Sequence, residues 1–140
     1  ARPAVLAHNL ETVRRLTEKV RDSRAGYDQS LDVLRYLKQN CSDGYTKSSL
    51  MLGVGESRTE TLQAMKDLRN VGVDFLTIGQ YLQPSKKHLK VEKFVPPEEF
   101  DELALHGDKM GFEYVASGPL VRSSYKAAEF YIERKIRGKA

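Results

Sequence analysis

SSLMLGVGESRTE, residues 48–60, is the stretch that decides the fold. Its apolar first half is typical of a buried strand, which we expect over residues 48–54. Ser57 and Glu60 then match a capping box, the sequence signature of a helix that begins directly after Ser57. A buried strand that passes directly into a helix is the unit from which parallel sheets are built.

The same unit recurs along the chain. Strands are expected at residues 5–7, 48–54, 73–78 and 114–116, and helices at residues 10–20, 27–37, 57–72, 97–110 and 125–137. This alternation predicts an α/β fold with a parallel sheet and helices outside it. Because a small parallel sheet on its own would leave exposed edges, we interpret the chain as part of a barrel whose other strands lie upstream.

Composition narrows the class of protein. The chain has 140 residues, 40% of them hydrophobic, which suits one compact domain or a piece of a larger one. No apolar run approaches the roughly 18 residues of a membrane span, so no membrane partner is expected. The single cysteine, Cys41, excludes an internal disulfide and by itself makes no metal site.

The formal charge of +4 is modest, and several lysines and arginines cluster in the last residues of the chain. An anionic ligand or an acidic partner would suit this balance, as would a merely solvated basic surface. Lys86, Lys87 and the basic C-terminal residues also leave a nucleic-acid-binding module as an alternative. No interleaving of aromatic and basic residues supports that alternative, so no nucleic acid is expected.

In parallel barrels the functional site lies at the carboxyl ends of the strands. Two glycines, Gly53 and Gly55, follow one predicted strand, and residues without side chains allow a ligand to approach the backbone closely. Glu56 follows them, and the amino end of the next helix would attract an anion. The alternative is an ordinary turn between a strand and a helix.

Polar side chains follow two other predicted strands. Asn9 and Glu11 come after the first one and can hydrogen-bond sugar hydroxyls, or else cap a helix. Gln80 and Tyr81 follow another, where an amide beside an aromatic ring can read and stack a base, or simply pack at the edge. Together these groups predict a nucleotide-like ligand without indicating a reaction.

Four stretches resemble the lipoyl synthases, in the order in which that family has them. They are residues 7–13, AHNLETV; 46–56, TKSSLMLGVGE; 76–89, LTIGQYLQPSKKHL; and 117–125, SGPLVRSSY. The resemblance covers nearly the whole chain. It implies the C-terminal part of a partial (β/α)6 TIM-like barrel of the radical S-adenosylmethionine (SAM) type, with a C-terminal helical extension. Residues 1–116 would be barrel and residues 117–140 the extension.

The resemblance also implies a reaction. Lipoyl synthases carry two 4Fe–4S clusters, cleave SAM to a 5′-deoxyadenosyl radical, and insert two sulfur atoms at C6 and C8 of an octanoyl chain on a carrier-domain lysine. The implied partners are octanoylated carrier domains, namely the E2 subunits of 2-oxoacid dehydrogenases and the glycine cleavage H protein, with an electron donor such as ferredoxin or flavodoxin. The implied location is the mitochondrion, or alternatively the bacterial cytoplasm.

The same resemblance assigns residues. It places eight of them at SAM: Asn9, Glu11, Lys47, Gly53, Gly55, Glu56, Gln80 and Tyr81. In the segment Arg122-Ser123-Ser124-Tyr125 a serine would ligate the auxiliary cluster; Ser124 is favoured over Ser123, and Arg122 and Tyr125 support the motif. No residue of this chain is assigned as catalytic.

The chain departs from the family in one respect. Both cysteine triplets of the lipoyl synthases are absent from these 140 residues, so we expect no complete cluster and no turnover by this chain alone. Another radical SAM sulfur-insertion enzyme of the biotin synthase type and a non-catalytic barrel fragment are the alternatives.

Overall fold

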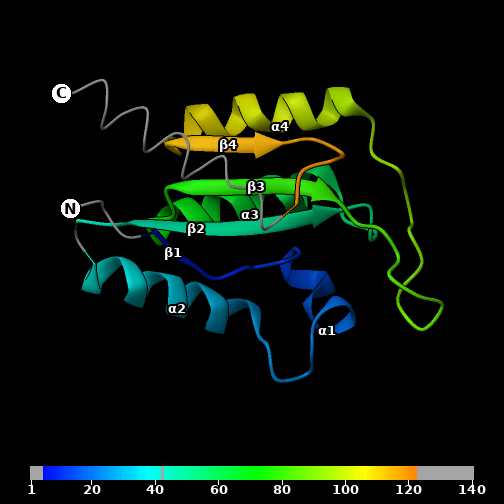
Figure 1. The fold of residues 1–140 in the computed structure, drawn as a ribbon, viewed down its shortest axis with the longest axis horizontal. Coiled ribbons are helices and arrows are strands. Elements are labelled where there is room, and N and C mark those ends of the chain that lie inside the picture. The colour runs from blue at the N-terminus through cyan, green and yellow to red at the C-terminus, as the bar shows by residue number, and fades with distance from the viewer. Residues whose placement is uncertain (1–4, 42, 123–140) are drawn as a thin grey trace.

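A computed structural model describes residues 5–41 and 43–122. Its elements are, in chain order, β1 (Val5–Ala7), a 3-10 helix (Arg14–Leu16), α1 (Thr17–Val20), α2 (Tyr27–Asn40), β2 (Tyr45–Leu52), α3 (Arg58–Asn70), β3 (Phe75–Gln80), α4 (Pro97–Met110) and β4 (Tyr114–Ser117). The four strands form one parallel sheet in the order β1-β2-β3-β4, which confirms the predicted α/β fold with a parallel sheet (Figure 1).

The helices pack on one face of this sheet. Parallel strands that follow chain order with right-handed connections place every connecting helix on the same side. Alternate strand residues turn toward the helices, and these are large, apolar and buried: Leu50 and Leu52 of β2 and Leu76 and Ile78 of β3. They share one hydrophobic cluster with Leu31 and Leu34 of α2, Met65 and Leu68 of α3, and Phe100 and Leu103 of α4.

The opposite face of the sheet is more polar. Because side chains alternate along a strand, Lys47, Ser49 and Met51 of β2 share this face with Thr77 and Gly79 of β3. Register pairs Ser49 with Thr77 and Met51 with Gly79. We call it the inner face, because the predicted barrel would curve around it.

The sequence signals for the start of α3 and for both ends of α4 are confirmed. Ser57 caps α3: its side chain accepts a hydrogen bond from the Glu60 N–H at 3.1 Å, and the Glu60 carboxylate accepts one from the Ser57 N–H at 2.9 Å. Pro97 opens α4 with acidic residues in the first turn, and Gly111 follows as its C-cap. The helix predicted at residues 125–137 lies outside the described residues.

One predicted helix is wrong in its first half. Residues 9–13 are not helical, and Asn9 caps nothing there; helical structure begins only at Arg14. Instead the Glu11 N–H donates to the Ser49 carbonyl at 2.9 Å, and the Met51 N–H donates to the Glu11 carbonyl at 2.8 Å. These bonds to β2 satisfy the backbone in place of a helical turn. The apolar spacing at residues 10, 13 and 16 marks buried residues and not a helix.

No helix in the described part of the chain is both long enough and apolar enough to cross a membrane.

Candidate functional site

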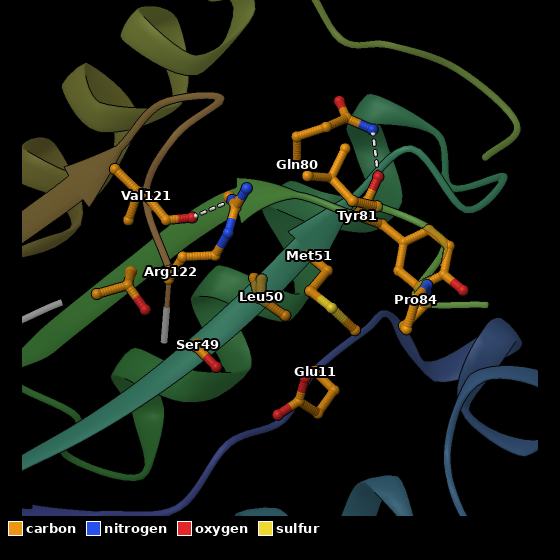
Figure 2. A pocket seen from close by; sticks show the side chains of 12 residues that line it. Glu11, Ser49, Leu50, Met51, Gln80, Tyr81, Pro84, Val121 and Arg122 are labelled. Carbon is orange, nitrogen blue, oxygen red and sulfur yellow. Dashed lines mark hydrogen bonds between the residues drawn. The ribbon is translucent and has the colours of Figure 1, made fainter. Parts of the chain in front are cut away.

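A cavity of about 300 Å³ opens on the inner face, toward the carboxyl ends of β2 and β3 (Figure 2). Its walls mix apolar and polar groups. The apolar lining comes from Leu50, Met51, Leu82, Pro84 and Val121, and the polar side chains from Glu11, Ser49, Thr77 and Arg122, with Gly79, Gln80 and Tyr81 completing the wall. Such a mixture, mostly apolar with a few convergent polar groups, is typical of a small-molecule site.

Two residues of the cavity wall carry buried hydroxyls. Ser49 and Thr77 lie opposite each other on β2 and β3, and their exposed fractions are 3% and 4%. Neither hydroxyl oxygen has a hydrogen-bond partner among the described residues. Because a buried hydroxyl without a partner costs on the order of 1–3 kcal/mol, the pair is suited to a polar group that enters the cavity.

Glu11 brings a carboxylate to the same cavity from a strained backbone. Its φ of 74° lies in the left-handed region, which disfavours side chains other than glycine. Burial raises the pKa of this carboxyl above its ordinary value, and a hydrogen bond with Asn9 and the charge of Arg21 lower it in part. A partly buried carboxylate held in a strained conformation is a common sign of a functional residue.

The raised pKa of Glu11 makes stability depend on pH. Between the ordinary and the raised pKa the folded chain binds more protons than the unfolded chain, so the free energy of unfolding falls as pH rises through that window. Glutamine does not ionise, so Glu11→Gln removes this fall in the free energy of unfolding. We expect the variant to be more stable than the unmodified protein at about pH 7 and to match it below the ordinary pKa.

Denaturant titrations of the protein at both pH values measure this difference, with Glu18→Gln as the control because Glu18 is exposed in α1. Identical pH profiles for the unmodified protein and Glu11→Gln would contradict the assignment.

Residues 118–122 bring Arg122 to the cavity. The Gly118 N–H donates to the Ile78 carbonyl at 3.0 Å, which fastens the segment to β3. Arg122 then donates to the Pro119 and Val121 carbonyls at 3.2 and 3.0 Å and lies along the cavity wall (Figure 2). Within residues 5–41 and 43–122 the Arg122 guanidinium bonds only backbone carbonyls, so none of these residues neutralises its charge, which an anionic group of a ligand could meet.

Known proteins match the chain almost from end to end. No family model matches it. A lipoyl synthase of Myxococcus xanthus is 59% identical over 133 residues, which are 95% of this chain and 45% of that protein. A chloroplastic lipoyl synthase of Zea mays and a mitochondrial one of Branchiostoma floridae are each 58% identical over 95% and 96% of this chain, and 36% of their own lengths. The chain is homologous to the lipoyl synthases. It spans less than half the length of these relatives.

Some of the residues that the lipoyl synthase resemblance assigns to SAM meet at the cavity. Glu11, Gln80 and Tyr81 line it, and Asn9 hydrogen-bonds Glu11. The Gln80 side chain is already fully used, however. Its Nε2 donates to the Tyr81 and Lys93 carbonyls and its Oε1 accepts from the Val95 N–H, each at 2.9 Å. Gln80 therefore lines the cavity, but its amide is not free to read a base.

Other residues assigned to SAM do not line the cavity. Glu56 accepts hydrogen bonds from the N–H groups of Gly53 and Val54 at 3.0 Å, so it closes its own turn. Gly53 has a φ of +97°, and a Cβ there would clash with the Gln80 side chain and the Lys93 carbonyl. This glycine makes room for the protein's own loop. Gly55 also lies outside the cavity lining.

Lys47 shares the inner face with Ser49 and is buried in β2, one side-chain position nearer the amino end of the sheet and outside the cavity lining. The predicted cluster ligands Ser123 and Ser124, with Tyr125, lie outside the described residues.

Sequence reasoning missed Ser49, Thr77 and Met51 as parts of the site. A signal for them existed. Lys47 and Ser49 are polar at alternate positions of one strand, and Thr77 interrupts an apolar strand at the register position opposite Ser49. Residues 46–49 are all polar, so β2 itself does not alternate, and Thr77 in the apolar run of β3 is the clearer signal of a polar position on this face.

Proposed function

We propose that this chain is the C-terminal part of a lipoyl synthase, an enzyme that uses SAM to insert two sulfur atoms at C6 and C8 of a protein-bound octanoyl chain. The observation that carries the proposal is the identity of 58–59% to lipoyl synthases over 95% or more of the chain. Proteins with this level of sequence identity usually keep the same chemistry at their functional site. Residues 1–116 would complete a (β/α)6 barrel with upstream strands, and residues 117–140 would form its extension.

The cavity fits SAM by the chemistry of its lining. SAM carries an α-carboxylate, an ammonium group and ribose hydroxyls, and the cavity offers the Arg122 guanidinium, the Glu11 carboxylate and the unpartnered Ser49 and Thr77 hydroxyls. SAM, when bound and reduced, supplies a 5′-deoxyadenosyl radical. Asn9 and Glu11 would hold the SAM molecule, because Asn9 orients the Glu11 carboxylate. The apolar side chains Met51 and Leu82 would exclude water.

The two 4Fe–4S clusters do not fit this chain alone. Such clusters are held mainly by cysteine thiolates, and the chain contains one cysteine. Cys41 follows α2 and precedes β2, so it lies at the amino end of the sheet, away from the cavity. No group of three or more His, Cys, Asp or Glu side chains in residues 5–41 and 43–122 is placed to hold a metal. A serine of the Ser123-Ser124 pair remains our proposed ligand of the auxiliary cluster.

Octanoylated carrier domains and an electron donor of the ferredoxin or flavodoxin type are the proposed partners. We propose the mitochondrion as the location, with the bacterial cytoplasm as the alternative. Of the three relatives described above, one is named mitochondrial, one is named chloroplastic, and one comes from Myxococcus xanthus.

Glu11→Ala in the complete protein tests the SAM site. We expect SAM to bind at least about tenfold more weakly, which corresponds to about 1.4 kcal/mol, because a charged contact in a partly enclosed cavity is lost. Isothermal titration with SAM measures the affinity, and mass spectrometry of an octanoylated carrier domain measures sulfur insertion. Glu18→Ala removes an exposed carboxylate of α1 and is expected to change neither. A complete, reconstituted protein that adds no sulfur to the carrier would refute the proposed function.

A further inference from the structure

The connection between β3 and α4 is irregular in conformation but firmly held. The Tyr81 hydroxyl donates to the Leu89 carbonyl at 2.7 Å, the Glu92 N–H donates to the Gly53 carbonyl at 2.8 Å, and the Val95 N–H donates to Gln80. We call residues 82–95 the β3–α4 loop. A connection of this length without helices or strands usually serves a function, and the bonds show that this one is built to keep its shape.

The β3–α4 loop exposes a strong positive charge. Lys86, Lys87 and Lys90 are exposed, and none of them forms an ion pair with a carboxylate in the described part of the chain. Lys93 pairs with Glu99 at 3.4 Å, and Glu92 is the only acid within the loop. Like charges held close together on one ordered loop create a positive potential that attracts an acidic surface.

The loop stands at the mouth of the cavity. Its first residues, Leu82 and Pro84, form part of the cavity wall. Figure 1 shows it projecting past the arrowheads of β2 and β3, the end of the sheet where the cavity opens. Leu82 and Phe94, near the two ends of the loop, are 50% and 71% exposed. Exposed apolar side chains beside lysines are suited to contact a protein surface, since protein interfaces combine apolar anchors with a charged rim.

We propose that the β3–α4 loop docks an acidic face of a partner protein domain and thereby aims that domain's modified side chain into the cavity. This inference rests on the proposed function for what the side chain carries, namely an acylated lysine. The charge and position of the loop support a docked domain in their own right. Complementary charge of this kind mainly raises the association rate, so the effect weakens with salt.

The double variant Lys86→Glu/Lys87→Glu in the complete protein tests the proposal. Its matched control is Lys66→Glu/Lys109→Glu, which makes the same change of charge at exposed positions on α3 and α4. The probes are a purified octanoylated carrier domain and a short octanoyl-lysyl peptide. We expect the loop variant to bind the domain about tenfold more slowly at low salt and to show a raised KM for it, with unchanged turnover of the peptide. The control should resemble the unmodified protein.

The outcomes separate the two proposals. Equal association rates and KM values for the loop variant, the control and the unmodified protein would overturn the docking surface. Tighter binding of duplex DNA than of the carrier domain, lost in the loop variant, would overturn it in favour of a nucleic-acid surface. Failure of the unmodified protein to convert either probe would refute the proposed function, and the docking surface would then be decided by the association rates alone.

Discussion

Gln80→Leu is expected to release the β3–α4 loop and to destabilise the protein by about 2–5 kcal/mol. The Gln80 amide makes three hydrogen bonds, to the Tyr81 carbonyl, the Lys93 carbonyl and the Val95 N–H, and its exposed fraction is 7%. Leucine has a similar size and can make none of them. Each buried backbone group left without a partner costs about 1–3 kcal/mol, so local detachment of the loop becomes the less costly outcome.

Limited proteolysis measures loop detachment, and denaturant unfolding measures stability. Gln83→Leu is the matched control, because Gln83 is exposed and makes a single bond to the His88 carbonyl at 3.0 Å. We expect this control to shift stability by less than about 0.5 kcal/mol, as exposed substitutions usually do. Equal rates of cleavage in the loop for the two variants would show that Gln80 does not anchor it.

The role of Gln80 marks the limit of what sequence can predict at this site. Its place at the carboxyl end of β3 follows from the apolar run before it, and the sequence predicts that place correctly. Its partners Lys93 and Val95 lie 13 and 15 residues further on, in a loop with no periodic pattern. The sequence of an irregular loop does not show which of its carbonyl groups point toward an amide such as that of Gln80. An amide that anchors a loop and an amide that binds a ligand therefore look the same in the sequence.

Regular elements were easier to predict because their signals are local. The Ser57–Glu60 capping box, the Pro97 helix start and the Gly111 cap each depend on residues within one helical turn. The helix predicted to begin after Asn9 was wrong over residues 9–13 for the opposite reason. Helical spacing of apolar residues was present, but the backbone of Glu11 bonds to Ser49 and Met51 of β2, some 40 residues away. Long-range pairing outweighed a local pattern.

Gly79→Ala is expected to push residues 118–122 off the inner face, so that Arg122 no longer lines the cavity. Gly79 lies in β3, opposite Met51, and a Cβ added there would clash with the Val121 carbonyl oxygen. That oxygen cannot move freely, because the Gly118 N–H is fastened to the Ile78 carbonyl and the Val121 N–H to the Gly118 carbonyl, at 3.0 and 3.1 Å. Overpacking against fixed backbone costs about 1–3 kcal/mol.

Gly118→Ala is the matched control, since among the described residues the added Cβ would meet only the Val121 side chain, at 3.6 Å, which is an ordinary van der Waals contact. Hydrogen exchange at the Val121 amide reports directly on the segment, and SAM titration reports on the cavity. We expect faster exchange and weaker SAM binding for Gly79→Ala, and neither for the control. Unchanged exchange in Gly79→Ala would mean that the strand yields instead of the segment. The absence of a side chain at residue 79 would then serve β3 itself and not the placement of Arg122.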